Sequence, residues 1–536
     1  MVSSGVSLLS LRGYLNHKKA PFFIAKKGAF CLWLKLVVTI VDHFKESFTF
    51  AYQFTFTAYP MLFNSYSFVL LVLLTFGLYY LPVRTRAAWQ LSILILSSLF
   101  FYGYYQPLLV LLLLGSVTIN IISSYLIIHG AAYCHLLHSV WGVVANLSIL
   151  IFFKYSSLFA HTFLPVQSEI GSFLLNLPLP IGISFFTFQG ISLIVDTYRN
   201  RNNAAYRQLI PKSIVEHSKR VLFFKAFFPQ LVSGPIVKAH FFLPQIEEKF
   251  LHSIRWEYVF KNLTLGYFFK MVIADNLKDH TSIITYPYFE AESTLTLLIA
   301  LFGYSMQIFA DFAGYSLIAL GLAALFGYQF PINFNFPYIS TSFSEFWRRW
   351  HISLSSFLRE YLYIPLGGNR KGEARTCLNL FLTMVLGGLW HGAAWSYAVW
   401  GAFHGLALLL ERYITTHLKI RETRISQIFK GGLVFSLVTL GWLLFKLPEF
   451  SHVVAFFKAL TTNYNRPLNT LPVALILLFS MPVIAYHIWY VWGEQSMERI
   501  WVQKRLLQVE PYVLGCMLFM IITNSGSSTD FIYFQF

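Results

Sequence analysis

The sequence predicts an all-α, polytopic integral membrane protein, and its composition, its apolar runs and its charge distribution each support this. Of the 536 residues, 56% are hydrophobic and only 12% are charged, whereas soluble domains carry about 25% charged residues. Apolar runs bounded by charges or turn residues recur along the chain. They cover residues 66–82, 89–105, 107–129, 139–153, 181–195, 258–274, 294–326, 378–390, 398–410, 432–445, 471–489 and 512–522.

Some of these runs reach the roughly 20 residues that an α-helix needs to cross a bilayer, and others are too short. Short or broken apolar segments must be shielded by protein or line a cavity, because lipid offers no hydrogen-bond partners to the backbone. We therefore expect about ten full spans together with a few re-entrant or buried helices.

The formal net charge is +17, which in a soluble protein would raise nucleic acid as a partner. Here the basic residues cluster in loops, at residues 84–86, 199–220, 412–430 and 504–505, as is typical of loops held on the cytoplasmic side. We expect no nucleic-acid partner. The four cysteines are far apart and form no C-x-x-C pair, so neither a disulfide framework nor a thiolate metal site is predicted.

Residues 1–60 differ from the rest of the chain. Five lysines between residues 18 and 35 interrupt the apolar character, and the ordered parts of a signal peptide are missing. Residues 47–83 contain no charge, and Met61 stands at the head of the first convincing span. The extension is either an extra amphipathic or membrane segment, or a stretch ahead of a true start at Met61; we favour the second. Residues 61–536 then form the membrane domain.

Two segments between residues 174 and 235 are interrupted by proline. In residues 174–199, Pro178 and Pro180 fit the start of a helix, and Asp196 and Arg199 mark a membrane boundary. Residues 227–235, FFPQLVSGP, place two prolines and a glycine in apolar surroundings. We expect this second segment to be broken and shielded by protein.

The chemistry is concentrated between Asp311 and His404. Asp311 is the only charged residue between Glu292 and Glu345. It either orients a histidine or caps a broken helix, and the sequence leaves both interpretations open. His404 is expected to be structural. The spacing of the histidines in this window does not resemble the converging ligands of a zinc site, so no metal is predicted.

A helix is predicted to begin at Phe343, because Ser342 and Glu345 form a capping box. One face of that helix would contain Trp347, His351, Leu354 and Leu358. His351 therefore points toward the apolar, protein-facing side, while Arg349 lies on another face. A hydrogen-bonded core histidine would show the same pattern.

A glycine-bracketed basic loop follows at residues 366–372, LGGNRKG, and contains Asn369 and Arg370. Such a loop can bind the phosphate or pyrophosphate of a donor, although it matches neither the P-loop nor the dinucleotide motif. A simple cytoplasmic turn would look much the same, and both interpretations remain open.

His391 directly follows the apolar run 378–390 and stands in the sequence GGLWHG, where small residues let backbones approach closely. An ionisable group at such depth is costly and marks a functional site by default. An imidazole can take the proton of an attacking hydroxyl and return it to a leaving group, which is worth roughly 10²–10⁴-fold in rate. The alternative is a histidine at the membrane interface beside Trp390.

Several of these motifs together resemble one family. QIFADFAGYS, EFWRRWHISLSSFLREYLYIPLGGNRKG and LGGLWHG resemble the membrane-bound O-acyltransferase family, in its bacterial branch of alginate and related polysaccharide O-acetylases. The resemblance extends upstream through LPIGISFFTFQGISLIVDTYR, FFPQLVSGPIV and GYFFKMVIADNL, and downstream to the closing FIYFQF. It covers the chain from about Met61 to Phe536.

The resemblance implies a ring of tilted transmembrane helices around a central funnel with re-entrant segments. His391 matches the invariant catalytic histidine of the family, and His351 matches the second family histidine. The candidates for supporting or substrate-tunnel roles are Asp311, Trp350, Trp390, Arg349, Asn369 and Arg370. No tightly bound cofactor is implied; the acyl donor would be acetyl-CoA or another acyl thioester arriving from the cytoplasmic side.

The function implied is O-acetylation of an exported or cell-envelope polysaccharide by a multi-pass protein of the cytoplasmic (inner) membrane, with a histidine as general base. The acceptor would be the polysaccharide or an SGNH-type acetyltransferase partner outside the membrane. A D-alanyl transferase acting on teichoic acid is the nearest alternative. A proton-coupled transporter using Asp311, His351 and His391 is the alternative from a different class.

Overall fold

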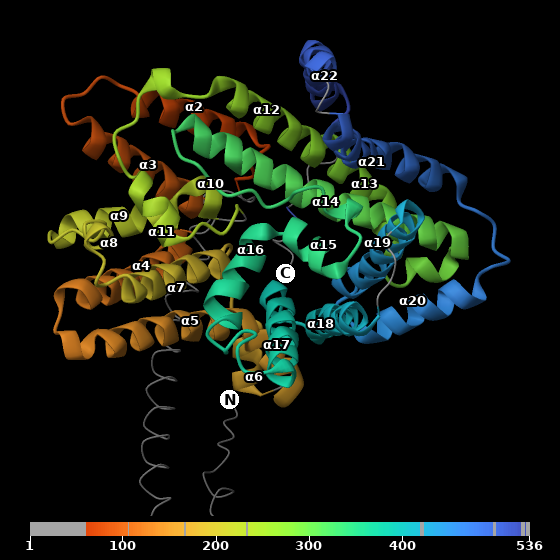
Figure 1. Ribbon diagram of the computed structural model, residues 1–536, viewed down its shortest axis with the longest axis horizontal. Helices are drawn as coiled ribbons and strands as arrows, with labels where there is room; N and C mark the ends of the chain where they lie inside the picture. Colours follow the sequence, from red (N-terminus) through yellow and green to blue (C-terminus); the bar gives the residue numbers. More distant parts are fainter. Residues whose placement is uncertain are drawn as a thin grey trace, which may run out of the picture. The chain divides into compact units, whose positions relative to one another are not determined.

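The computed structural model describes residues 61–104, 107–165, 168–231, 234–418, 423–496, 500–526 and 531; the expectations for residues 1–60 lie outside this range. Across the described ranges the chain is helical and contains no β-strand, as predicted (Figure 1). The helices are α2 (Tyr66–Tyr79), α3 (Arg86–Gly103), α4 (Pro107–His129), α5 (His135–Phe163), α6 (Glu169–Leu175), α7 (Ile183–Arg199), α8 (Ala204–Arg207), α9 (Ile214–Ala226), α10 (Phe228–Leu231), α11 (Ala239–Phe242), α12 (Trp256–Tyr267), α13 (Asp275–Thr281), α14 (Thr294–Leu325), α15 (Phe343–Arg349), α16 (Ile352–Leu358), α17 (Glu373–His391), α18 (Trp395–His417), α19 (Arg424–Lys446), α20 (Phe450–Thr462), α21 (Thr470–Ser496) and α22 (Ile500–Thr523).

Shorter turns connect these helices. Two of them are π-helical, η5 (Phe268–Ala274) and η9 (Arg359–Tyr363). The 3₁₀ turns are η2 (Ala132–Cys134), η3 (Leu243–Gln245), η4 (Leu251–Ser253), η6 (Ser282–Ile284), η7 (Tyr288–Ala291) and η8 (Pro337–Ile339). π-helical turns inside α-helices occur often at functional sites, and η9 leads toward the glycine-bracketed loop.

Five helical stretches of the described residues are long and apolar enough to cross a membrane: Pro107–His129, Ala132–Phe163, Thr294–Leu325, Arg424–Lys446 and Thr470–Val491. The polytopic prediction is confirmed, but this count is below the about ten full spans expected from the runs. The run 181–195 forms the 17-residue α7, and the run 258–274 is divided between α12 and η5. Neither is among these five stretches. The central funnel stays a prediction.

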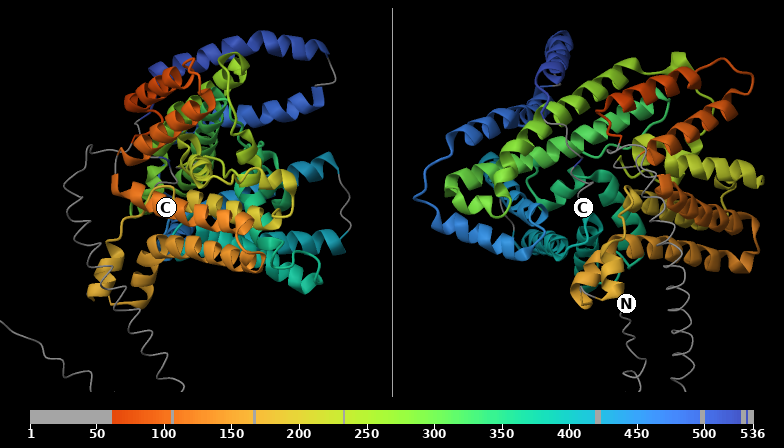
Figure 2. Two further views of the ribbon diagram at one scale, coloured as in Figure 1. Left: turned by 90° about the vertical axis from the view of Figure 1, so that its left-hand side faces the viewer. Right: turned by 180° about the vertical axis from the view of Figure 1, so that it is seen from behind.

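Helices α4, α5 and α7 pack against one another, and Figures 1 and 2 show them side by side. Asn120 of α4 and Asn146 of α5 bond to each other through their side chains at 3.1 Å. Gly190 of α7 sits against this pair: a Cβ atom there would lie 2.7 Å from the Asn120 amide group. The absence of a side chain at Gly190 therefore lets α7 approach a buried polar contact that lipid could not satisfy.

The longest helix, α14, is surrounded by protein, with 89% of its apolar window buried. It packs on α12, α13, α21 and η5. A Cβ atom on Gly314 would lie 2.8 Å from the carbonyl oxygen of Gly266, so these helices approach closely through glycine. The broken segment around α10 is also enclosed, because Phe227, Phe228 and Leu231 are fully buried. Its predicted shielding by protein is confirmed.

Candidate functional site

His391 is the last residue of α17 and is almost fully buried, with 4% of its surface exposed. The helix ends there because Gly392 is extended, with φ −160° and ψ 160°. A Cβ atom on Gly392 would overlap the ring of Tyr397. The predicted close approach of small residues is confirmed at Gly388, whose added Cβ would collide with the carbonyl of Tyr397 on α18 and lie 2.9 Å from the Cα of Gly401.

His351 is fully buried, as its apolar neighbours predicted, but the single helix expected from residue 343 onward is wrong. Helix α15 begins at Phe343 as predicted and ends at Arg349; His351 then adopts a left-handed backbone conformation, with φ 43° and ψ 54°. The break is held from outside the segment: Asn335 N–H donates to the Arg349 carbonyl, and Ile352 N–H donates to the Asn333 carbonyl, both at 2.9 Å. These backbone bonds replace the helical ones.

Only one of the two hydrogen bonds of the capping box that predicted α15 is formed. Ser342 Oγ accepts from Glu345 N–H at 3.1 Å. The Glu345 carboxylate instead accepts from Thr341 N–H at 2.9 Å and pairs with Arg349 Nε at 2.9 Å. Arg349 also donates to the Asn335 carbonyl at 3.1 Å. Arg349 therefore braces the break before His351.

The two candidate histidines come together, with their ring centroids 6.2 Å apart. Asn333 orients His351, because its Oδ1 lies 3.3 Å from His351 Nδ1 and accepts from Ser353 Oγ at 2.6 Å. Phe312 meets the His351 ring edge-on at 4.6 Å. The two histidines are 40 positions apart in the sequence, and only the family resemblance implied that they act together.

Aromatic rings enclose His391. Trp400 of α18 and Phe445 of α19 meet its imidazole edge-on, each with ring centroids 5.3 Å away. Trp390 stacks on Phe188 of α7 at 5.2 Å. Trp350, another candidate from the sequence, is buried, and its ring centroid lies 4.9 Å from that of Trp442. The rings around the site therefore come from α7, α17, α18, α19 and the residue that follows α15.

Three tryptophans near the histidines carry buried indole N–H groups for which the described residues supply no acceptor: Trp347, Trp390 and Trp400. Leaving such a donor unsatisfied costs about 1–3 kcal/mol. Donors of this kind are suited to a carbonyl oxygen that becomes negatively charged during a reaction, because they are already in place and shielded from water. Both ring nitrogens of His404 are likewise buried without a partner among the described residues.

Asp311 lies on α14 and forms a buried ion pair with Lys270 of η5, at 2.8 Å. Lys270 also pairs with Asp275 at 2.8 Å. The cation and the second carboxylate were not singled out from the sequence; a lysine inside the apolar run 258–274 was the available signal. Asp311 thus joins α14 to η5 through a charged contact.

Asn369 and Arg370 are exposed in the turn before α17, whereas His391 ends that helix. The loop contacts the helix at Asn379, which lies twelve residues before His391, or about 18 Å at 1.5 Å per residue. The loop is tied to the helix by Asn379, whose Nδ2 donates to the Gly368 carbonyl at 3.0 Å. The structure therefore does not bring these two candidates together with the histidines.

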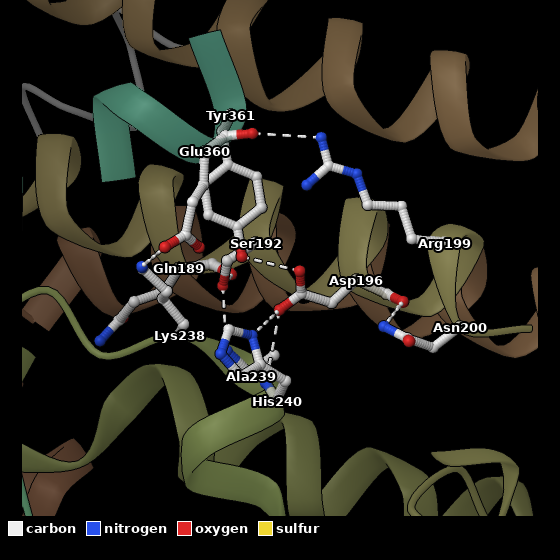
Figure 3. Close-up of polar contacts among 10 residues, drawn as sticks. All are labelled: Gln189, Ser192, Asp196, Arg199, Asn200, Lys238, Ala239, His240, Glu360 and Tyr361. Carbon is white, nitrogen blue, oxygen red and sulfur yellow. Dashed lines mark hydrogen bonds and ion pairs between the residues drawn. The ribbon is translucent and has the colours of Figure 1, made fainter. Parts of the chain in front are cut away.

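A second polar centre joins α7, η9 and the segment around α11, outside the five spans (Figure 3). The buried Asp196 carboxylate accepts from Tyr361 Oη at 2.7 Å and lies 2.8 Å from His240 Nδ1. This hydrogen bond to Asp196 raises the pKa of His240 against the opposing effect of burial. Lys238 pairs with the Glu360 carboxylate at 2.8 Å. None of these contacts was predicted beyond the boundary role of Asp196.

Comparison with known proteins finds relatives over the part of the chain that contains these residues. The model of the membrane-bound O-acyltransferase family matches residues 94–447. A peptidoglycan O-acetyltransferase of Helicobacter pylori is 35% identical over 388 residues, which cover 68% of this chain and 73% of the relative. A probable alginate O-acetylase of Pseudomonas aeruginosa is 36% identical over 398 residues, 72% of each chain. A teichoic acid D-alanyltransferase of Bacillus subtilis is 28% identical over 291 residues, covering 52% of this chain and 71% of the relative.

Proposed function

This chain belongs to the membrane-bound O-acyltransferase family, and from that membership we propose that it O-acetylates an exported or cell-envelope polysaccharide. It is a multi-pass membrane acyltransferase. Two relatives that act in acetyl transfer, at 35% and 36% identity, support the choice of acetyl over D-alanyl groups, since the D-alanyl relative is 28% identical. Acyltransferase membership argues against the proton-coupled transporter.

The observation that carries the proposal is the pair of buried histidines beside indole N–H groups that have no acceptor among the described residues. His391 acts as general base and takes the proton of the acceptor hydroxyl. The hydroxyl oxygen then attacks the thioester carbonyl, so that a C–O bond forms and the C–S bond breaks. His391 returns the proton to the sulfur leaving group, and His351 positions or relays it. The indole N–H groups of Trp390 and Trp400 stabilise the negative carbonyl oxygen.

The donor is an acyl thioester, such as acetyl-CoA, that arrives from the cytoplasmic side of the inner membrane. It is consumed as a substrate, and the chain needs no tightly bound cofactor. The acceptor is the polysaccharide hydroxyl or an SGNH-type acetyltransferase that completes the transfer outside. The direction of this transfer follows from where each substrate is made, because thioesters are cytoplasmic and the polymer is exported.

The test is acetyl transfer by membrane vesicles that contain the full chain, supplied with labelled acetyl thioester and the polysaccharide. His391→Ala is expected to lower the rate by about 10²–10⁴-fold with normal amounts of protein in the membrane. His217→Gln is the matched control, since His217 is fully buried and bonds Ser124 at 2.9 Å on other helices. Normal acetylation by His391→Ala would exclude the assignment.

The D-alanyl alternative is separated in the same vesicles by the donor. Vesicles supplied with a D-alanyl thioester and teichoic acid should show no transfer if the chain is an acetylase. Transfer of D-alanine in preference to acetyl would instead favour the second function, which the 28% identical relative suggests.

A further inference from the structure

A lysine is buried within a membrane-spanning stretch without a carboxylate partner among the described residues. Lys154 lies on α5 and is 5% exposed. It falls just after the apolar run 139–153 and plays no part in the proposed reaction. A charge at this depth is costly and needs a reason.

The ammonium group is matched to three acceptors. Lys154 Nζ donates to the carbonyl of Trp390, to the carbonyl of His391 at 3.0 Å and to Ser184 Oγ at 3.1 Å. A lysine ammonium has three N–H donors, so each of them is used. The next residue, Tyr155, donates its hydroxyl to the Leu389 carbonyl at 2.7 Å. Two adjacent side chains of α5 therefore bind three consecutive carbonyls of α17.

These carbonyls are the ones that a helix cannot satisfy by itself. The last four carbonyls of an α-helix have no partner within the helix, and water is not available to them in a bilayer. The end of α17 also carries partial negative charge, which a cation stabilises. Because the helix stops at His391, the groups that hold its last carbonyls also hold the backbone that carries the imidazole.

We propose that Lys154 is a positioning residue for the acyl transfer: it fixes the end of α17 and thereby holds His391 against His351 and Trp400. This inference rests on the proposed role of His391. Lys154 does not touch substrate. Its effect on the rate comes from the position of His391, because a displacement of about 1 Å in a reacting group can cost about 10²-fold in rate.

The test compares Lys154→Met with Lys225→Met in the vesicle assay. Methionine fills the volume of the aliphatic stem without a charge or donor. Lys225 is the control because it is also fully buried, on α9, and its ammonium bonds Ser116 Oγ at 2.6 Å rather than α17. The kcat and the KM for the acyl thioester are measured per amount of folded protein, which is determined separately.

We expect Lys154→Met to lower kcat by about 10²-fold with an unchanged KM, because binding of the donor does not depend on the imidazole position. Lys154→Arg keeps a charged donor and should recover part of kcat. Tyr155→Phe should lower kcat less than Lys154→Met, since it frees one carbonyl that is two residues before His391. Lys225→Met should leave kcat unchanged.

A kcat within about twofold of wild type for Lys154→Met would overturn the inference. So would a loss of folded protein with normal kcat per folded molecule, or an equal loss of kcat in Lys225→Met. If Lys154→Met does not accumulate, Tyr155→Phe decides instead: a kcat per folded molecule equal to that of wild type would overturn the inference. Failure of the proposed function is a separate result, namely normal activity of His391→Ala.

Discussion

Gly388→Ala is expected to disturb the site through the contact between α17 and α18. The added Cβ would lie 2.9 Å from the Cα of Gly401, and closer still to the carbonyl of Tyr397. Carbon atoms make optimal contact at about 3.5–4.0 Å, so the two helices must separate by about 0.6–1.1 Å. Both obstacles are backbone atoms, which cannot turn aside as a flexible side chain can.

The separation has two measurable consequences. Overpacking of this kind destabilises a protein by about 1–3 kcal/mol. Gly388 also lies three residues before His391, so the shift moves the imidazole, and a displacement of about 1 Å costs about 10²-fold in kcat. We expect a lower unfolding temperature together with that loss of acetyl transfer.

The assay is thermal unfolding of the purified protein in detergent, followed by the vesicle assay of acetyl transfer. Gly432→Ala on α19 is the control, because no atom lies within 4 Å of its added Cβ. Alanine is the better helix former by about 1 kcal/mol, so this control should be neutral or stabilising. If Gly388→Ala matched Gly432→Ala in unfolding temperature and kcat, the close contact of α17 and α18 would be refuted.

The remaining predictions concern three other contacts. His240→Gln should remove part of the pH dependence of stability: the raised pKa means that the His240 and Asp196 pair is fully formed below the ordinary histidine pKa of about 6.5 and is lost as pH rises through the higher folded value. Unfolding temperatures of variant and wild type should therefore converge at alkaline pH, and a constant difference from pH 5 to pH 9 would contradict this. Asp311→Asn should destabilise by about 1–3 kcal/mol, because Lys270 loses one of two carboxylates inside the protein; an unchanged denaturation midpoint would show that Asp275 suffices. Asn333→Ala should lower kcat as well as stability, because Asn333 contacts His351 and Ser353 and donates to Ser316 Oγ at 3.0 Å, whereas normal kcat per folded molecule would leave it a structural residue.

The local chemistry of the sequence predicted the class of protein and part of the site. The low fraction of charge and the recurring apolar runs reflect what a bilayer accepts, so the helical membrane fold follows from them. The burial of His351 and His391 follows from their apolar neighbours. The glycines around His391 predicted close helix contact, because a residue without a side chain lets two backbones approach whichever helix is the partner.

The predictions failed where a local pattern was overruled by distant atoms. Periodicity favoured one helix through His351, but the backbone of Asn333 and Asn335 binds the chain there and bends it. Fewer helices than the apolar runs suggested are long and apolar enough to cross a membrane, because some runs form helices shorter than a span, such as the 17-residue α7. Asn369 and Arg370 looked close to the histidines in sequence, yet a straight helix carries them to its other end.

By itself, the sequence determined that the chain is helical, lies in a membrane and buries ionisable groups, because these properties depend on composition and on short-range spacing. Only the tertiary structure decided which groups meet. The contacts between His351 and His391, between Asp311 and Lys270, and between Lys154 and the end of α17 join residues separated by 40, 41 and more than 230 positions. Such contacts are set by how whole helices pack, and that packing leaves no periodic signal in the chain.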